Sequence, residues 1–194
     1  MHLKFAKTAA RAMAVSALTV ASGLGVAQAA LADPASNGIN VPCSADALYN
    51  YINDNTGGET LSLAQFCTYK LPGALPDITE DVTINGNQST IERSYAPDTP
   101  DFSILTVSAD VDLVLNRVNF RNGSATETDS SEGGAIDNTD GTVTVNGGTF
   151  TGNTATYEGG AIYNDADLTV QGASFTGNST AEWPALSLTR VTRR

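Results

Sequence analysis

The amino-acid sequence predicts an all-β fold: a right-handed, single-stranded parallel β-helix (a solenoid) of about five coils with an N-terminal capping helix, over residues 33–182. The first observation is an internal repeat, because "EGGAIDN" at residues 132–138 returns as "EGGAIYN" at residues 158–164. The second is a series of short segments in which apolar and polar residues alternate. One such segment cannot bury its own apolar face, whereas similar segments stacked in register share a continuous core.

Residues 1–32 have the pattern of a signal peptide. Lys4, Lys7 and Arg11 form a basic start, an apolar run follows over about residues 12–26, and small residues close the segment. Cleavage is expected after Ala29 or Ala32. No later stretch reaches the roughly 20 apolar residues of a membrane-spanning helix. The mature protein is therefore predicted to be secreted or located at the cell surface.

Charge and histidine content exclude several function classes. From Asp33 onward the chain keeps 7 of its 10 basic residues and all 21 acidic ones, so its net charge is −14. Nucleic acid and anionic membranes are therefore not expected as partners. The one histidine, His2, is lost with the signal peptide, which excludes a Ser-His-Asp triad and every His-ligated metal site from the mature protein.

The N-terminal part of the predicted domain contains a loop, a helix and a pair of cysteines. Residues 33–43 have the composition of a loop, and "SADALYNYINDN" at residues 44–55 predicts the capping helix, with Ser44 as its N-cap. Gly57 and Gly58 should stop this helix. An isolated cysteine pair in an exported chain is typical of a disulfide, so Cys43 and Cys67 are predicted to be bonded.

Five segments with a period of two follow, and they begin at Leu61, Val82, Leu113, Val143 and Leu168. Alternate apolar side chains should face the core. The inward pairs are Leu61/Leu63, Val82/Ile84, Leu113/Leu115, Val143/Val145 and Leu168/Val170, and the last three segments are followed at a fixed offset by Phe120, Phe150 and Phe175. No interval between these segments is long or apolar enough for a crossover helix.

The repeated glycines predict sharp corners between stacked strands. Gly133–Gly134 and Gly159–Gly160 should occupy the same corner of successive coils, where a Cβ would clash. Asparagines one coil apart should form amide ladders that satisfy corner carbonyls, and the two pairs are Asn138/Asn164 and Asn153/Asn178.

These motifs carry a resemblance to known families. "EGGAIDN", "FTGNTA", "EGGAIYN" and "FTGNST" resemble the GGA(I/L) and FxxN motifs of the polymorphic outer-membrane protein repeats. "CSADALYNYINDNTGGETLSL" through "DITEDVTINGNQSTI" is similar to the opening of secreted bacterial β-helix proteins of the pectin-lyase-like group. The resemblance covers roughly residues 43–180. It implies the fold more than an activity, because that fold hosts lyases, hydrolases and adhesins.

The chain departs from this pattern in two places. Asn122 comes one position earlier after Phe120 than the corresponding asparagine of the other copies. After Asn178, where a third "EGGA" would follow, the sequence reads "EWPALSLTRVTRR". Residues 183–194 are therefore interpreted as a C-terminal cap or a basic tail.

Glu132 and Glu158 are the candidate site residues, because stacking would place them about 5 Å apart. Such carboxylates could share a calcium ion or act as acid and base in glycoside cleavage, or form only a solvated acidic edge. No other cofactor is expected. Arg93, Arg117 and Arg121 are interpreted as surface charges.

Two functions of different class remain open at this point. The first is an exported, non-catalytic β-helix repeat protein that acts as a cell-surface, adhesive or scaffolding module. Its expected partner is a cell-surface glycan or protein, and the chain should be a monomer or associate end to end. The alternative is a small carbohydrate-active enzyme, lyase-like or hydrolase-like, with the pectin-lyase-like fold.

Overall fold

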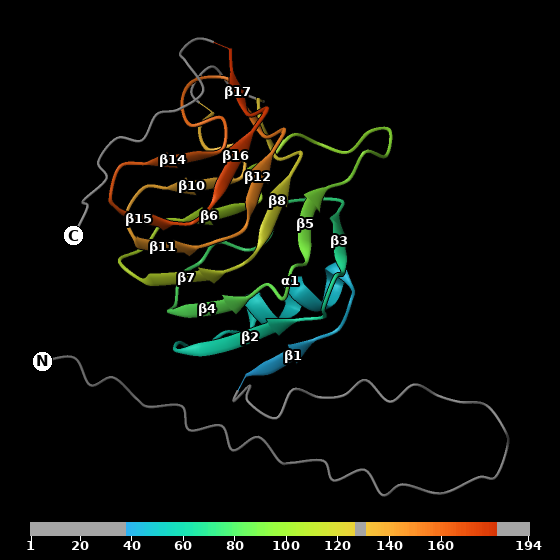
Figure 1. Cartoon of the computed structure of the whole chain (residues 1–194), viewed down its shortest axis with the longest axis vertical. Coiled ribbons are helices and arrows are strands. Elements are labelled where there is room, and N and C mark those ends of the chain that lie inside the picture. The colour runs from blue at the N-terminus through green and yellow to red at the C-terminus, as the bar shows by residue number, and fades with distance from the viewer. Residues whose placement is uncertain (1–37, 127–130, 182–194) are drawn as a thin grey trace, which may run out of the picture. The chain divides into compact units, whose positions relative to one another are not determined.

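The computed structural model describes residues 38–126 and 131–181, which form a parallel β-solenoid of about five coils with one short helix (Figure 1). The predicted fold class is confirmed. The predicted signal peptide of residues 1–32 and the predicted cap or tail of residues 183–194 lie outside the described residues.

The largest sheet contains one strand from each successive coil. Its order is β1 (Ile39–Val41), β2 (Glu59–Leu63), β4 (Val82–Asn85), β7 (Asp112–Asn116), β11 (Thr142–Asn146) and β15 (Asp167–Gln171). Every pairing in it is parallel. The five segments identified by their period of two are all strands of this one sheet.

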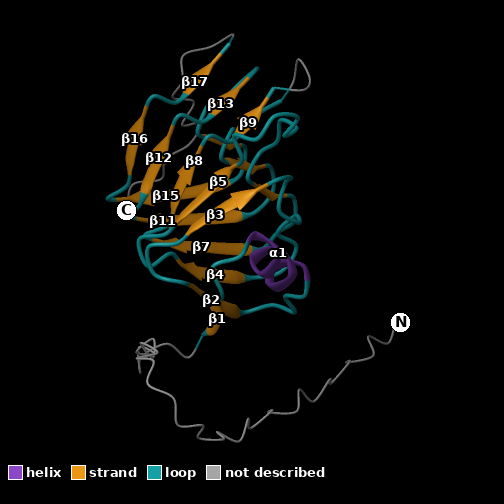
Figure 2. Cartoon of the chain, turned by 90° about the vertical axis from the view of Figure 1, so that its right-hand side faces the viewer, coloured by secondary structure: helices purple, strands orange, loops and turns teal. Residues whose placement is uncertain are grey.

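Three further sheets complete the coils, as Figure 2 shows from the side. The five-stranded sheet contains β3 (Thr68–Leu71), β5 (Thr90–Arg93), β8 (Asn119–Arg121), β12 (Thr149–Thr151) and β16 (Ser174–Thr176). One three-stranded sheet contains β6 (Leu105–Val107), β10 (Ile136–Asn138) and β14 (Ile162–Asn164). The other contains β9 (Ser124–Ala125), β13 (Thr154–Ala155) and β17 (Ser179–Thr180).

The helix α1 (Ala45–Asn53) packs beside β1 and β3. Ser44 is its N-cap, and the hydroxyl of Ser44 accepts a hydrogen bond from the Ala47 N–H at 3.4 Å. Leu48 and Ile52 are the buried residues of this helix, on the side that faces the core. Within residues 38–126 and 131–181, no helix combines the length and the apolar character needed to cross a bilayer.

Residues 39–41, predicted as loop, are instead the edge strand β1, paired in parallel with β2. The strand is only three residues long and lies between Gly38 and Pro42, so it has no recognisable alternation. Its partners hold it in place: the Val41 carbonyl O accepts hydrogen bonds from the Ala64 N–H and from the Tyr69 hydroxyl.

The register of the first coil also differs from the prediction. The starts of the first two segments aligned Leu61 with Val82, but Leu61 pairs with Ile84 and Glu59 pairs with Val82. A shift by one full period of the alternation leaves the same side chains facing inward, so alternation alone cannot detect it. The later registers agree with the predicted alignment, with Val82 beside Leu113 and Val143 beside Leu168.

The predicted disulfide is present and joins Cys43, just before α1, to Cys67, just before β3. The two Cα atoms are 5.7 Å apart and the sequence separation is 24 residues. The bond therefore ties the helix that packs on the first coils to the strand beneath it.

The core is built from ranks of identical or similar side chains. The Phe120 and Phe150 rings stack with centroids 5.1 Å apart, and the Phe150 and Phe175 rings stack at 4.8 Å. Ile136 pairs with Ile162 on neighbouring strands, and both are buried. Equal side chains at equal positions explain why these coils repeat with so little variation.

Candidate functional site

The two GGA corners place Glu132 and Glu158 at adjacent positions on consecutive coils. The Gly133 N–H donates a hydrogen bond to the Glu158 carbonyl O at 3.0 Å. Gly133 and Gly159 have φ values of 64° and 63°, in the left-handed region. A Cβ on Gly133 would also lie 2.2 Å from the Ile136 carbonyl O, so only glycine fits at this corner.

The second glycine of each corner is required for a different reason. A Cβ on Gly134 would lie 2.4 Å from the carbonyl O atoms of both Gly160 and Thr154. A Cβ on Gly160 would lie 2.4 Å from the Ser179 carbonyl O. These glycines therefore allow the coils to approach each other, and their positions determine where the preceding glutamates project.

The carboxyl group of Glu132 is the centre of an acidic cluster. Burial raises the pKa of Glu132, and the negative charges of Asp137 and Glu158 raise it further. The Tyr163 hydroxyl donates a hydrogen bond to Glu132 and partly opposes this shift. Burial and the charges of Glu132 and Asp165 raise the pKa of Tyr163 to about 12, so Tyr163 remains a hydrogen-bond donor at neutral pH.

Asp137 lies on β10, between Thr106 of β6 and Tyr163 of β14. Burial raises the pKa of Asp137 from 3.8 to about 6, and the charge of Asp77 contributes to this shift. One oxygen, Oδ1, is buried and has no hydrogen-bond partner among the described residues. The buried Asp137 therefore holds a proton more readily than an aspartate in water does.

The part of the sequence that contains the acidic cluster has no basic residue. No lysine, arginine or histidine occurs between Arg121 and Arg190. Within the part of the chain that the structure describes, no set of three or more acidic, cysteine or histidine side chains converges well enough to hold a metal ion. The candidate calcium site at Glu132 and Glu158 thus stays a prediction that depends on two carboxylates.

The sequence indicated that Asp137 lies near the glutamates and that Tyr163 flanks the second corner, but it predicted neither the burial of Asp137 nor the hydrogen bond from Tyr163 to Glu132. The signal was in the repeat itself, because "EGGAIDN" and "EGGAIYN" differ only at this position. The structure places Asp137 and Tyr163 side by side on neighbouring strands, and Tyr163 reaches the glutamate of the preceding coil. The one changed residue in the repeat is therefore the residue that modifies the acidic cluster.

Two of the arginines interpreted as surface charges also form ion pairs, and the Arg121 side chain remains 47% exposed. Arg121 donates from Nε to Glu92 Oε2 at 2.6 Å, and the Glu92 side chain is only 1% exposed. Arg93 donates from Nη2 to Asp101 Oδ1 at 2.6 Å and from Nε to the Pro100 carbonyl O at 2.8 Å. Arg117 is exposed, as expected.

The Arg93 contacts fix the base of a loop, residues 94–101, that protrudes after β5 (Figure 1). Asp101 also accepts a hydrogen bond from Thr126. This bond, together with Ser124 and the Arg93 charge, lowers the pKa of Asp101. At the start of the loop the Tyr95 side chain is 66% exposed. The loop is thus anchored at its base and presents an aromatic side chain to solvent.

The asparagine ladders connect successive coils. Asn153 Nδ2 donates to Asn178 Oδ1 at 2.9 Å, and Asn138 Nδ2 donates to Asn164 Oδ1 at 2.6 Å. Asn153 is fully buried and also accepts a hydrogen bond from the Gly123 N–H at 2.9 Å. Each buried amide therefore satisfies backbone groups that the corners leave without a strand partner.

The displaced Asn122 has a structural explanation. Asn122 has φ 59° and Gly152 has φ 62°, so Asn122 takes the left-handed position that glycine occupies one coil later. Gly123 then stands where Asn153 stands in the next coil, and a Cβ there would lie 1.9 Å from the Gly134 carbonyl O. The order of asparagine and glycine is inverted because that position has no room for a side chain.

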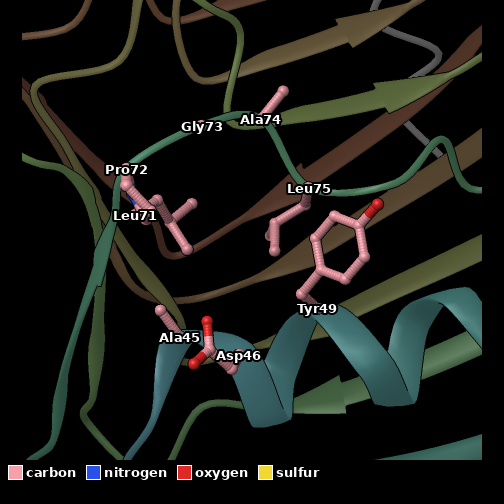
Figure 3. A pocket seen from close by; sticks show the side chains of 8 residues that line it. All are labelled: Ala45, Asp46, Tyr49, Leu71, Pro72, Gly73, Ala74 and Leu75. Carbon is pink, nitrogen blue, oxygen red and sulfur yellow. The ribbon is translucent and has the colours of Figure 1, made fainter. Parts of the chain in front are cut away.

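A small cavity of about 160 Å³ lies between α1 and the segment that follows β3 (Figure 3). Asp46 and Tyr49 project into it from the helix, and Leu71, Pro72 and Leu75 form the opposite wall. Tyr49 is exposed at its rim. The cavity is smaller than the roughly 300 Å³ at the lower end of typical ligand pockets.

A known repeat family matches part of the C-terminal coils. Residues 144–165 match the Chlamydia polymorphic membrane protein (Chlamydia_PMP) repeat. The matched segment begins inside β11, passes Phe150 and Asn153, and ends just after β14. Together with the solenoid fold, this match supports a β-helix repeat protein that resembles these proteins. No curated protein and no solved structure matches the chain.

Proposed function

We propose that this chain is an exported, non-catalytic β-helix repeat protein that acts as a binding module at a cell surface, in an adhesive or scaffolding role. The observation that carries this proposal is the match of residues 144–165 to a polymorphic membrane protein repeat. In this structure the match falls on a complete corner with its phenylalanine and asparagine ranks. The partner is a cell-surface glycan or a protein.

One structural feature supports a location outside the cytoplasm and a second supports a role in binding. A disulfide at Cys43–Cys67 is typical of proteins that fold in oxidising compartments. The loop of residues 94–101 is held at its base by Arg93 and exposes Tyr95, and aromatic side chains on anchored loops are common contact residues in recognition.

Location is tested first, by following the tagged full-length chain in its native host. Limited protease treatment of intact cells, compared with lysed cells, should remove the protein from the intact cell surface, or the protein should be recovered from the medium. Recovery of uncleaved protein inside protease-treated intact cells would contradict the proposal.

Binding is tested separately with the purified mature protein on a glycan array and on whole cells. Retention that is lost in Tyr95→Ala, but not in the control Tyr49→Ala on the helix, would support recognition by the loop. Equal binding by both variants would exclude the loop as the contact surface while leaving the surface location intact.

A small carbohydrate-active enzyme is the second candidate, and the raised pKa values of Glu132 and Asp137 favour it. Glycosidases use one carboxyl group that holds its proton together with one that is ionised. Release of reducing ends or unsaturated products from polyuronates or neutral glycans, abolished by Asp137→Asn, would establish this function in place of the first. A glycan that is bound but not cleaved would support the binding module.

A further inference from the structure

The coil at the C-terminal end of the described residues is open. The strands β14, β15, β16 and β17 each stand last in the order of their sheets, and all belong to this coil. Within residues 38–126 and 131–181, none of the four has a strand on its outer side. Unpaired parallel edges of this kind are templates for a further strand.

The same end exposes part of the apolar core. Phe150 and Phe120 are 0% and 1% exposed, whereas Phe175, the last ring of the stack, is only partly buried. Val145 is buried on β11, and Val170, its partner on β15, is only partly buried. Among the described residues, Phe175 and Val170 thus lack the neighbour that covers Phe150 and Val145 one coil earlier.

The chain continues from this end with residues 182–194. Their sequence contains the pattern of one further strand beside β14, with apolar side chains that face the core. Ala135–Ile136 at the start of β10 returns as Ala161–Ile162 at the start of β14, and Ala185–Leu186 follows after a similar interval. In the sheet of β6, β10 and β14, the inward pair on β6 is Leu105/Val107. On a further strand beside β14, the corresponding inward pair would be Leu186/Leu188. Both of these pairs are wholly apolar, and neither contains an asparagine like those of the amide ladder in β10 and β14.

Charge favours the chain's own segment over a second copy. The last coil contains Glu158, Asp165 and Asp167, while residues 182–194 contain Arg190, Arg193 and Arg194. Two open ends brought together would place equal negative charges against each other. A basic segment attached directly after β17 has the opposite charge and a high effective concentration.

We propose that residues 182–194 dock on the open edge of the last coil, with residues 185–188 adding a parallel strand to β14 and Trp183 packing against the apolar end of the core. The arginines then lie beside the acidic residues of the last coil. This interaction closes the solenoid and keeps the chain monomeric.

Trp183 is the one tryptophan of the chain, so its fluorescence reports on this segment directly. In the native mature protein we expect emission shifted to the blue of the unfolded protein by several nanometres and a several-fold lower acrylamide quenching constant. Sedimentation should show a monomer under the same conditions. Native emission equal to that of the unfolded protein would overturn the proposal.

Leu186→Lys and Ser187→Lys form a matched pair, because the added charge is the same and the expected faces of the strand are opposite. Leu186→Lys should move Trp183 emission to the unfolded value while the circular dichroism of the solenoid is retained, and should cause self-association at the exposed edge. Ser187→Lys should leave both readouts at the wild-type value. Equal effects of the two substitutions, or Trp183 burial that disappears on dilution, would contradict docking within one chain and indicate a second copy.

Discussion

The N-terminal and C-terminal parts of this solenoid build similar coils by different means. Residues 38–93 contain the helix and the disulfide, neither of which has a counterpart on another coil of the described structure. They also contain the fully buried Tyr69, which stands in register with Ile91 and Phe120 but donates a hydrogen bond to Val41 that neither of these can form. Residues 131–181 instead repeat the same glycine corner, phenylalanine ring and asparagine amide from coil to coil. The structure of a coil can therefore depend on contacts that occur in that coil alone or on contacts that recur in successive coils. Only the recurring contacts appear as a periodic pattern in the sequence.

The two parts also differ in how they compensate charge. Glu92 and Asp101 are each paired with an arginine, and the Arg93 contacts hold a protruding loop. The C-terminal part has no basic residue between Arg121 and Arg190, and burial and neighbouring carboxylates raise the pKa values of Glu132 and Asp137. The repeated half thus has no basic residue of its own that could pair with its acidic groups.

The largest effect is expected from filling a repeated corner. Gly134→Val or Gly160→Val places side-chain atoms where a Cβ alone would be 2.4 Å from a backbone carbonyl O, so the coils must separate. We expect a loss of more than about 3 kcal/mol in the free energy of unfolding, measured by chemical denaturation.

Gly152→Val is the control for the corner substitutions. Gly152 has φ 62° but no atom within 4 Å of its Cβ position, so valine there meets backbone strain without a clash. We expect a loss of about 1–2 kcal/mol. Equal losses at Gly134 and Gly152 would show that backbone conformation, rather than the close approach of coils, is the reason for the paired glycines.

Loss of the disulfide should act on the part that does not repeat. In the Cys43→Ala/Cys67→Ala variant we expect a loss of about 3 kcal/mol, because the bond closes a loop with a sequence separation of 24 residues. Hydrogen exchange should show faster exchange in α1 and β1 than in β11 to β15. A uniform increase along the whole solenoid would mean that the two parts unfold as one cooperative unit.

A fully buried ladder asparagine should contribute more to stability than a partly buried one. Asn153→Ala leaves the Gly123 N–H and the Phe120 carbonyl O without their side-chain partner, and we expect a loss of about 2 kcal/mol. Asn146 also forms a ladder, donating to Asn116 at 2.9 Å, but it is only partly buried. Asn146→Ala should cost no more than about 0.5 kcal/mol, and thermal unfolding of the two variants side by side measures the difference.

The difference between the two parts also explains what could be predicted from the sequence. The corners at Gly133 and Gly159 could be predicted because the same steric requirement appears twice with nearly the same letters. The strand β1 and the pairing of Leu61 with Ile84 could not, because each depends on partners that occur once. The helix was an exception, since its cap and its apolar stripe are local signals.

The candidate site was predictable only in part, for a related reason. Stacking of equivalent glutamates follows from the period, but pKa shifts depend on burial and on side chains from other strands. Asp77 influences Asp137 from a distant position in the sequence, two coils earlier, which no local pattern indicates. The Arg121 and Glu92 pair has the same character, since its members lie on neighbouring strands of different coils.

The smallest expected effect concerns the uncompensated charge of Asp137, and it has a defined sign and pH range. The pKa of Asp137 is raised from 3.8 to about 6, so the folded state binds a proton more tightly than the unfolded state. At pH 7 the carboxyl is ionised in both states and its charge opposes folding; as the pH falls from about 6 to about 4, the folded state is protonated first and this cost disappears. Asp137→Asn should therefore stabilise the protein at pH 7 by about 1 kcal/mol, a figure reduced for the part of the side chain that faces solvent. The gain should vanish near pH 4.

Denaturation of both proteins at a series of pH values measures the difference, and Asp112→Asn, at an exposed aspartate, is the matched control with no expected gain. A gain from Asp137→Asn that is the same at pH 4 and pH 7 would show that the amide stabilises the strand through hydrogen bonding, and that the acidic face carries no electrostatic cost at this position.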